Sequence, residues 1–239
     1  PGRREVTLTV TDATGATATT TETVDVRPPL RWSTGVGESV RSSPTVVEGT
    51  VYIGGTVGVS ALSATTGEID WTRPTDGVVV GAPTVVDGTV YAGTATVGGD
   101  ADLYALDSET GQQRWTTTAD GLGLFRSSSP TVIDNTLYIG TGGRGGFGSL
   151  GRAGVLAVST GDGTRQFVTE IRFGVPSSPT VANGIVYVGT DGVDTGTLSA
   201  IDTETGTSLW NVDTDLPPRA CAAGAVRDSH ILSPLPHCR

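Results

Sequence analysis

Apolar and polar positions alternate over short stretches of the chain, and these stretches end in Gly, Asn or Asp. Four segments share one pattern and begin at Ser42, Gly81, Ser128 and Ser177: SSPTVVEGTVYIG, GAPTVVDGTVYAG, SSPTVIDNTLYIG and SSPTVANGIVYVG. In each segment a tyrosine follows the proline by eight residues. Two-residue alternation is typical of strands, and Asp-Gly or Asn-Gly pairs tolerate the positive φ of tight hairpins. Each segment therefore predicts two antiparallel strands.

A second block follows each of these segments. The blocks are ALSATTGEIDW, ALDSETGQQRW, AVSTGDGTRQF and AIDTETGTSLW, and they begin at Ala61, Ala105, Ala157 and Ala200. A glycine always stands six residues after the alanine, and a large aromatic residue stands four residues further on. The closing aromatics are Trp71, Trp115, Phe167 and Trp210. A short apolar strand, a Gly turn and a strand ending on the aromatic are predicted for each block.

The two blocks together make a repeat of four antiparallel strands, which is typical of the blade of a β-propeller. No window has the 3.6-residue apolar period of a helix, so a helical solenoid is excluded. We predict an all-β propeller over residues 30–215, with blades at about 30–73, 74–117, 118–169 and 170–212. Small residues should crowd the ring centre, at the head of each first strand, and the closing aromatics should fill the wider space between outer edges. The predicted small residues are Ser43, Ala82, Ser129 and Ser178.

The run Pro-Thr-Val-x-Asp-Gly-x-Val-Tyr-x-Gly, followed by Ala-Leu-Asp-x-x-Thr-Gly-x-x-x-Trp, resembles the quinoprotein-type (PQQ-like) propeller repeat. This repeat also occurs in barrel-assembly lipoproteins of outer membranes and in many cell-surface proteins. The resemblance implies a ring of seven or eight blades, of which four are present here; a complete four-bladed ring or an open arc are the alternatives. Leu30–Thr34 resembles an isolated fourth strand, which ring closure could use.

The two ends of the chain differ from the repeat. Residues 5–26 alternate in polarity on either side of Asp12–Gly15 and predict a hairpin. The sequence of residues 1–27 resembles the last two strands of an immunoglobulin-like PKD-type domain. A hairpin alone buries too little surface, so we expect the other strands upstream. Residues 28–29 are predicted to be a stiff Pro-Pro linker.

Residues 216–239 match no repeat position, and we hypothesise a reading-frame change in the source DNA. They contain every Cys and His of the chain: Cys221, His230, His237 and Cys238. Their spacing does not match the paired spacing of zinc sites, so no metal site is expected. A Cys221–Cys238 disulfide is allowed if the protein is exported.

The formal net charge is −10, and all 15 basic residues are Arg. Nucleic acid is excluded as a partner because phosphate binding needs clustered positive charge. An acidic, Lys-free surface favours a halophilic source, although a GC-rich genome would also favour Arg. No apolar stretch approaches the roughly 18 residues of a membrane span. We expect an exported or cell-surface protein whose signal peptide lies upstream of Pro1.

Three motifs suggest chemistry, but each has a simpler interpretation. Gly140–Gly145 matches G-x-G-x-x-G with Asp162 further on, yet no helix can follow, so we interpret it as a loop. Asp191 and Asp194 could bind calcium but are also common turn residues. The resemblance to the quinoprotein-type repeat brings in a comparison with its active enzymes, which hold their quinone with a calcium ion, a disulfide of adjacent cysteines and a catalytic Asp. Since this chain has no adjacent cysteines and no His in its repeats, we predict no PQQ, no calcium, no catalytic residue and no enzymatic activity.

The lengths of the connections indicate a binding face. Turns within the two blocks are constant, whereas the connections from second to third strand and from fourth to first strand vary, and both lie at one edge of the blades. Variable connections on one face commonly mark the binding side, although neutral drift produces the same variation. Candidate residues from the longest connections are Phe125, Arg126, Arg144, Phe147 and Arg152. The predicted function is a non-catalytic binding or scaffolding module for an unknown protein or carbohydrate; the alternative is a fragment of a PQQ-dependent dehydrogenase whose site lies in further blades.

Overall fold

The structure is a computed structural model that describes residues 2–26, 31–96, 101–119, 121–122, 125, 127–142, 153–191 and 196–214. The chain divides into two compact units, Pro1–Thr34 and Gly35–Arg239. The sequence-based boundary at residues 28–29 would have assigned residues 30–34 to the second unit instead. Every regular element within the described ranges is a β-strand, and none of these residues forms a helix that could cross a membrane.

The first unit contains one antiparallel hairpin, formed by β1 (Gly2–Thr11) and β2 (Thr17–Val26). Its turn is closed by Asp12, whose Oδ1 accepts hydrogen bonds from the Thr14 N–H at 2.8 Å and the Ala16 N–H at 2.9 Å. On one face of the hairpin, hydroxyls of threonines directly opposite each other are hydrogen bonded. Leu8 and Val10, on the other face, are exposed by 60% and 58%. The hairpin predicted from alternation is present, and its membership in a PKD-like domain stays a prediction.

The second unit contains four antiparallel sheets, each built from four consecutive strands in the order first, second, third, fourth. Blade 1 consists of β3 (Thr45–Val47), β4 (Thr50–Gly55), β5 (Gly58–Ser63) and β6 (Ile69–Arg73). Blade 2 consists of β8 (Thr84–Val86), β9 (Thr89–Ala95), β10 (Asp102–Asp107) and β11 (Gln113–Thr118), and a short strand β7 (Val78–Val79) pairs with the end of β9. Blade 3 consists of β12 (Thr131–Ile133), β13 (Thr136–Thr141), β14 (Ala153–Ser159) and β15 (Arg165–Ile171). Blade 4 consists of β16 (Thr180–Ala182), β17 (Ile185–Gly189), β18 (Gly196–Asp202) and β19 (Ser208–Thr214).

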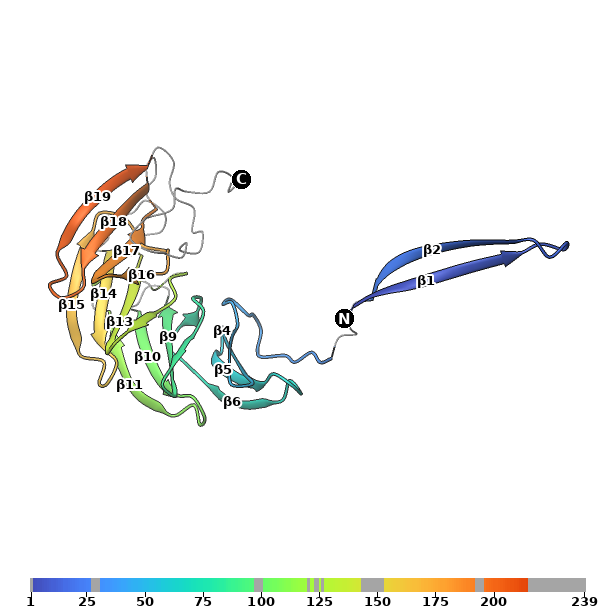
Figure 1. The fold of residues 1–239 in the computed structure, drawn as a ribbon. Helices are drawn as coiled ribbons and strands as arrows, with labels where there is room; N and C mark the ends of the chain where they lie inside the picture. Colours follow the sequence, from blue (N-terminus) through green and yellow to red (C-terminus); the bar gives the residue numbers. More distant parts are fainter. Residues whose placement is uncertain are drawn as a thin grey trace. The chain divides into compact units, whose positions relative to one another are not determined.

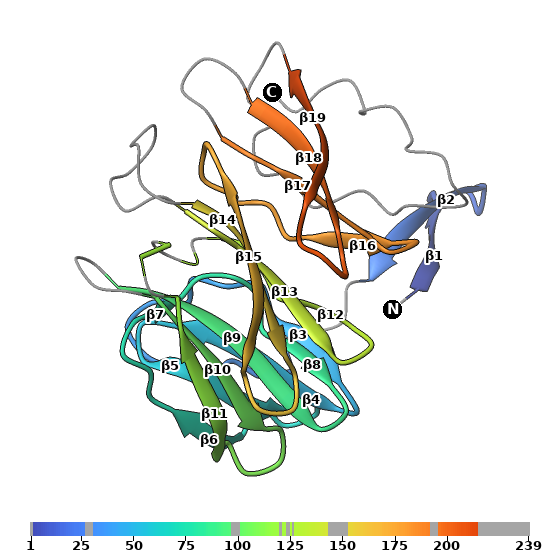
Figure 2. The same ribbon diagram turned by 90° about the vertical axis from the view of Figure 1, so that its left-hand side faces the viewer.

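The four blades follow one another side by side in chain order, as Figures 1 and 2 show. The propeller-type repeat predicted from the two blocks is therefore confirmed. Residues 31–36 are not in a strand. A fourth strand needs a third strand to pair with, and ring closure would have to supply that partner for these residues.

The tight turns take the conformation that their sequences predict. The first residue of each turn between first and second strands has positive φ: Glu48, Asp87, Asp134 and Asn183. The glycine of each turn between third and fourth strands also has positive φ, between 67° and 74°: Gly67, Gly111, Gly163 and Gly206. In every blade the pairing of the third and fourth strands shifts by one residue, and the extra residue lies in the fourth strand, three residues after this glycine. The constant length of both turns thus reflects a constant backbone geometry.

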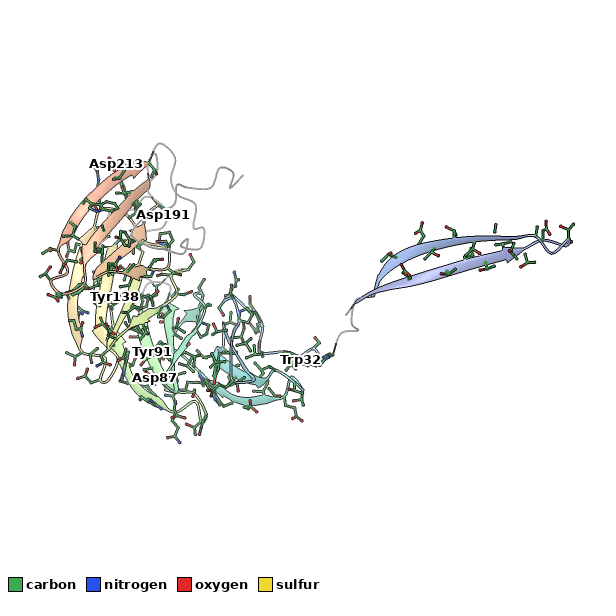
Figure 3. The ribbon with its side chains drawn as sticks, in the orientation of Figure 1. Trp32, Asp87, Tyr91, Tyr138, Asp191 and Asp213 are labelled. Carbon is green, nitrogen blue, oxygen red and sulfur yellow. The ribbon has the colours of Figure 1, made fainter. Side chains whose placement is uncertain are left out.

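The hydrophobic core lies between neighbouring blades. Three clusters of buried residues fill the interfaces of blades 1 and 2, 2 and 3, and 3 and 4. In every blade a tyrosine of the second strand lies beside the closing aromatic of the fourth, with ring centroids 5.8 to 6.2 Å apart. Figure 3 labels two of these tyrosines, Tyr91 on β9 and Tyr138 on β13. Each blade therefore covers one apolar flank of its neighbour, and this burial stabilises the stack.

The heads of the first strands are joined by short polar contacts. Ser129 Oγ accepts a hydrogen bond from the Ala82 N–H at 2.9 Å, and Ser178 Oγ accepts one from the Ser129 N–H at 3.0 Å. Only small side chains allow the backbones of neighbouring blades to approach so closely. The predicted crowding at this end of the blades is confirmed for blades 2, 3 and 4.

Candidate binding face

The variable connections meet at one edge of the blades, as the sequence predicts. The connections from fourth to first strand bond to the residues where second strands end. The Val175 N–H donates to the Thr141 carbonyl at 2.9 Å, and the Asp191 N–H donates to the Gly174 carbonyl at 3.0 Å. Strand β7 lies against the end of β9 in the same way. From the described residues of these connections we select 74–77, 96, 121–122, 172–174 and 190–191, and we call these residues the connection face.

We expected the Phe125 side chain to be exposed on this face, and the structure shows that this prediction is wrong. Its side chain is completely buried in the cluster between blades 2 and 3, where Leu122 and Ile139 also lie. The Phe125 N–H donates to the Thr94 carbonyl at 3.3 Å, which holds the connection against the end of β9. A Phe that can reach apolar space at the end of a blade gains more by burial than by exposure. The other four candidates, Arg126, Arg144, Phe147 and Arg152, lie outside the described residues.

Arg172 and Phe173 form a pair on the connection face that the sequence interpretation missed. The Arg172 guanidinium carbon lies 5.3 Å from the centroid of the Phe173 ring, which is a cation–π contact. Arg172 is exposed and Phe173 is half-buried. The sequence-based candidates come from the longest connections, whereas these two residues lie in a connection of ordinary length. The sequence does place an Arg next to an aromatic residue here, and both residue types are enriched at protein interfaces. This feature could have identified the pair.

Asp76 and Tyr104 form a second ordered contact on this face. The Tyr104 hydroxyl donates to Asp76 Oδ2 at 2.9 Å and accepts a hydrogen bond from the Asp76 N–H at 3.2 Å. Burial of the ring raises the pKa of Tyr104, so the hydroxyl stays a donor at neutral pH. Asp76 is exposed, and its loop is fixed by these bonds. The connection between blades 1 and 2 is therefore held in one shape.

The sequence motifs that suggested a dinucleotide site or a calcium site have structural roles in the residues that the structure describes. The Asp162 carboxylate accepts a hydrogen bond from the Thr164 N–H at 2.9 Å, and this bond lowers the pKa of Asp162 in the turn of blade 3. Gly140 lies in β13, and its N–H donates to Ser128 Oγ at 2.9 Å. Asp191 contacts Gly174 through its backbone. Figure 3 labels Asp191 beside the end of β17.

The remaining candidate ligands lie outside the described residues: Asp194, Cys221, His230, His237 and Cys238. Within the described ranges no three His, Cys, Asp or Glu side chains gather into a possible metal site. The absence of PQQ and calcium therefore stays a prediction from the sequence.

Comparison with known proteins identifies the repeat. The family model described as outer membrane protein assembly factor BamB matches residues 5–166 and 147–230. Comparison with curated proteins gave no match. The structure of BamB from Moraxella catarrhalis is 17% identical over 75% of this chain and 55% of its own, with a TM-score of 0.56. This chain thus spans about half the length of that protein.

Two dehydrogenase structures have the same fold. A europium-containing methanol dehydrogenase is 19% identical over 76% of this chain and 43% of its own, with a TM-score of 0.61. The quinohemoprotein alcohol dehydrogenase ADHIIG from Pseudomonas putida HK5 is 20% identical over 73% and 34%, with a TM-score of 0.55. Such low identities establish the fold and leave the activity open. On the family match, the chain belongs to the PQQ-like repeat family of the outer membrane protein assembly factor BamB.

Proposed function

We propose that this chain is a non-catalytic binding or scaffolding propeller of an exported or cell-surface protein, and that it binds a protein partner at the connection face. The observation that carries the proposal is the contrast between the two edges of the blades. One edge consists of turns of constant length and geometry, and the described parts of the connections whose lengths vary lie at the other. A rigid scaffold with variable loops on one face is a common arrangement for recognition.

The chemistry of the connection face supports a protein rather than a carbohydrate as the partner. Arg172 stacked on Phe173 offers a charged and an aromatic surface together, and both residue types are enriched at protein interfaces. Asp76 adds an exposed carboxylate in an ordered loop. The match to an assembly factor agrees with a role in contacting other proteins.

The test is photo-crosslinking of the full chain in an extract of the source organism's envelope, with a crosslinker placed at Arg172 or, as a control, at Glu204 on the opposite edge. A discrete crosslinked protein should form from position 172 and be absent from position 204. The double substitution Arg172→Ala with Phe173→Ala should weaken capture of that protein by the free chain at least about tenfold, as expected when central interface residues are truncated. Equal crosslinking from both edges would refute the proposal.

The competing function is that of a quinone-dependent dehydrogenase, and the fold shared with the two dehydrogenases is what favours it. It predicts that full-length protein mixed with PQQ and calcium retains a chromophore after gel filtration and reduces a dye when alcohol is added. Our proposal predicts free quinone and no dye reduction.

A further inference from the structure

Three completely buried threonines stand at the ends of second strands, three residues after the tyrosine of each strand: Thr94, Thr141 and Thr190. Blade 1 carries Gly55 at this position, and there the second strand turns directly into the third, since Gly55 pairs with Gly58. A Cβ at Gly55 would lie 2.4 Å from the Ser39 carbonyl oxygen, so a threonine has no room in blade 1. The threonine is thus present in the three blades whose connection to the third strand is longer.

The hydroxyl of the threonine closes the base of this connection. In blade 3, Thr141 Oγ1 accepts a hydrogen bond from the Gly154 N–H at 3.0 Å and donates to the Gly154 carbonyl at 3.3 Å. In blade 2, Thr94 Oγ1 makes the same two bonds with Asp102, at 2.9 and 3.1 Å. Backbone groups inside a protein need partners, and a hydroxyl is both donor and acceptor. One side chain therefore pairs the start of the third strand, whatever the length of the connection that precedes it.

The backbone of the same threonines holds the other kind of variable connection, from the fourth strand to the first. The Thr141 carbonyl accepts the N–H of Val175, a residue that is 1% exposed. The Thr94 carbonyl accepts the Phe125 N–H, and Thr94 also pairs with Val79 of β7. Each of these two residues is therefore a junction at which both variable connections of a blade are fixed.

The segment that carries the Arg172–Phe173 pair is fixed to two blades in this way. Its Gly174 carbonyl accepts the Asp191 N–H of blade 4 at 3.0 Å, and the residue after Gly174 is the one bonded to Thr141 of blade 3. Asp191 directly follows Thr190, whose Oγ1 accepts the Thr197 N–H at 3.0 Å. The cation–π pair is thus adjacent to two anchored backbone positions.

We propose that Thr141 is a positioning residue of the connection face, which holds the Arg172–Phe173 pair in place and couples it to the base of the long connection of blade 3. Thr190 has the same role from the side of blade 4. The proposal deepens the proposed function and rests on it, because the two connections would then meet the partner as one surface of fixed shape. Without the hydroxyl, the Gly154 N–H and carbonyl lose their partner, the strand end opens and Val175 loses its anchor.

The test is amide hydrogen exchange of the free full chain, followed by NMR in Thr141→Val and Thr141→Ser. Exchange of the Gly154 and Val175 N–H groups is expressed relative to that of Leu156, which lies in the middle of β14 and pairs on both sides. Thr141→Val should raise both ratios at least about tenfold, since it keeps the shape and removes the hydroxyl. Thr141→Ser keeps the hydroxyl and should leave both ratios within about twofold of the wild-type values. The ring-current shift that Phe173 causes in the Arg172 side chain should shrink in Thr141→Val only.

Thr169→Val is the matched control. Thr169 is another buried threonine of blade 3, and its Oγ1 donates to the Gly206 carbonyl of blade 4 at 2.6 Å. This change should lower stability and leave both exchange ratios unchanged. A second variant, Thr190→Val, keeps the backbone bond from the Thr190 N–H to the Thr197 carbonyl, so its blade stays paired, and it should raise the exchange ratio of the Asp191 N–H.

Three results overturn the proposal. Thr141→Val could speed exchange at Gly154 and leave Val175 unchanged, which would show that the two connections are not coupled. It could speed all three amides equally, or Thr169→Val could raise the ratios as much, and either result would reduce Thr141 to a general contribution to stability. No partner takes part in this measurement, so its result is separate from that of the proposed function, which fails on equal crosslinking from positions 172 and 204.

Discussion

The indole of Trp71 lies directly on Gly111 of the following blade: a Cβ built at Gly111 would come within 2.7 Å of two ring carbons. The same indole donates to the Ser108 carbonyl three residues earlier in that turn, at 2.9 Å. Trp71 and Trp115 are thus positioned by both the shape and the polarity of the next blade's turn, and Phe167 is positioned by shape against Gly206. This explains why the Gly and the aromatic recur at fixed spacing although they belong to different contacts.

Gly111→Ala should be strongly destabilising. Gly111 has φ of 67°, so alanine is strained there by about 1 to 2 kcal/mol, and the clash with Trp71 adds about 1 to 3 kcal/mol. Gly49→Ala is the control, since Gly49 has φ of 82° and nothing within 4 Å of an added Cβ. Urea unfolding should give a larger loss for the Gly111 variant. Equal losses would mean that the ring does not occupy the space above Gly111.

Gly81→Ser should destabilise the protein although it restores the serine that three of the four blades carry. A Cβ at Gly81 would lie 2.3 Å from the Ser128 carbonyl oxygen, and that oxygen belongs to backbone that cannot move aside cheaply. We expect a loss of about 1 to 3 kcal/mol by chemical denaturation. Gly161→Ser, whose Cβ would meet only Ser159 Oγ at 3.7 Å, should change stability by less than about 0.5 kcal/mol. A stabilised Gly81 variant would contradict the close approach of blades 2 and 3.

Ser128→Ala removes a hydroxyl that joins two blades. Ser128 is 1% exposed, and its Oγ accepts from the Gly140 N–H at 2.9 Å and donates to the Ser177 carbonyl at 3.0 Å. Leaving the buried Gly140 N–H and the carbonyl of the half-buried Ser177 unpaired should cost about 2 to 4 kcal/mol in thermal or urea unfolding. Ser43→Ala is the control, because Ser43 is an exposed serine at the repeat position of Ser129, and this change should be nearly neutral. Similar values for the two variants would exclude the bridging role.

Acid should destabilise the blades through their glycine turns. The Asp107 carboxylate accepts hydrogen bonds from Arg114 and Thr110, and the Asp202 carboxylate accepts them from the Thr205 N–H and hydroxyl. These bonds lower the pKa of both groups in the folded state. The unfolded chain therefore binds more protons near and below pH 4, so their contribution is present above that pH and is lost as the pH falls further. Melting temperatures should drop below about pH 4, and the double variant Asp107→Asn with Asp202→Asn should drop less steeply.

The sequence was sufficient to predict the blades because every strand, turn and closing aromatic recurs four times at fixed spacing. The contacts between blades required the structure. Nothing in the sequence pairs Trp71 with Ser108, since the two belong to different repeats. Strand β7 was not predicted because two residues carry no alternation, and it exists only because the end of β9 lies beside it.

The candidate site was predicted less well than the fold. Its edge of the blades follows from strand order alone, so that prediction agrees with the structure. Phe125 was misplaced because a long connection does not reveal whether its aromatic residue faces solvent or folds into an interface. Arg172 and Phe173 were missed because connection length, rather than composition, guided the search.

The most direct test of the stacked blades is a nuclear Overhauser spectrum that resolves the tryptophan rings. The structure predicts cross-peaks from ring protons of Trp71 to the Gly111 α protons, and from those of Trp115 to the Gly163 α protons, because a Cβ on either glycine would lie within 2.7 Å of ring carbons. Both pairs join different blades, so their detection would establish the order and the contact surface together. Cross-peaks from these rings to glycines of their own blades alone would contradict the account.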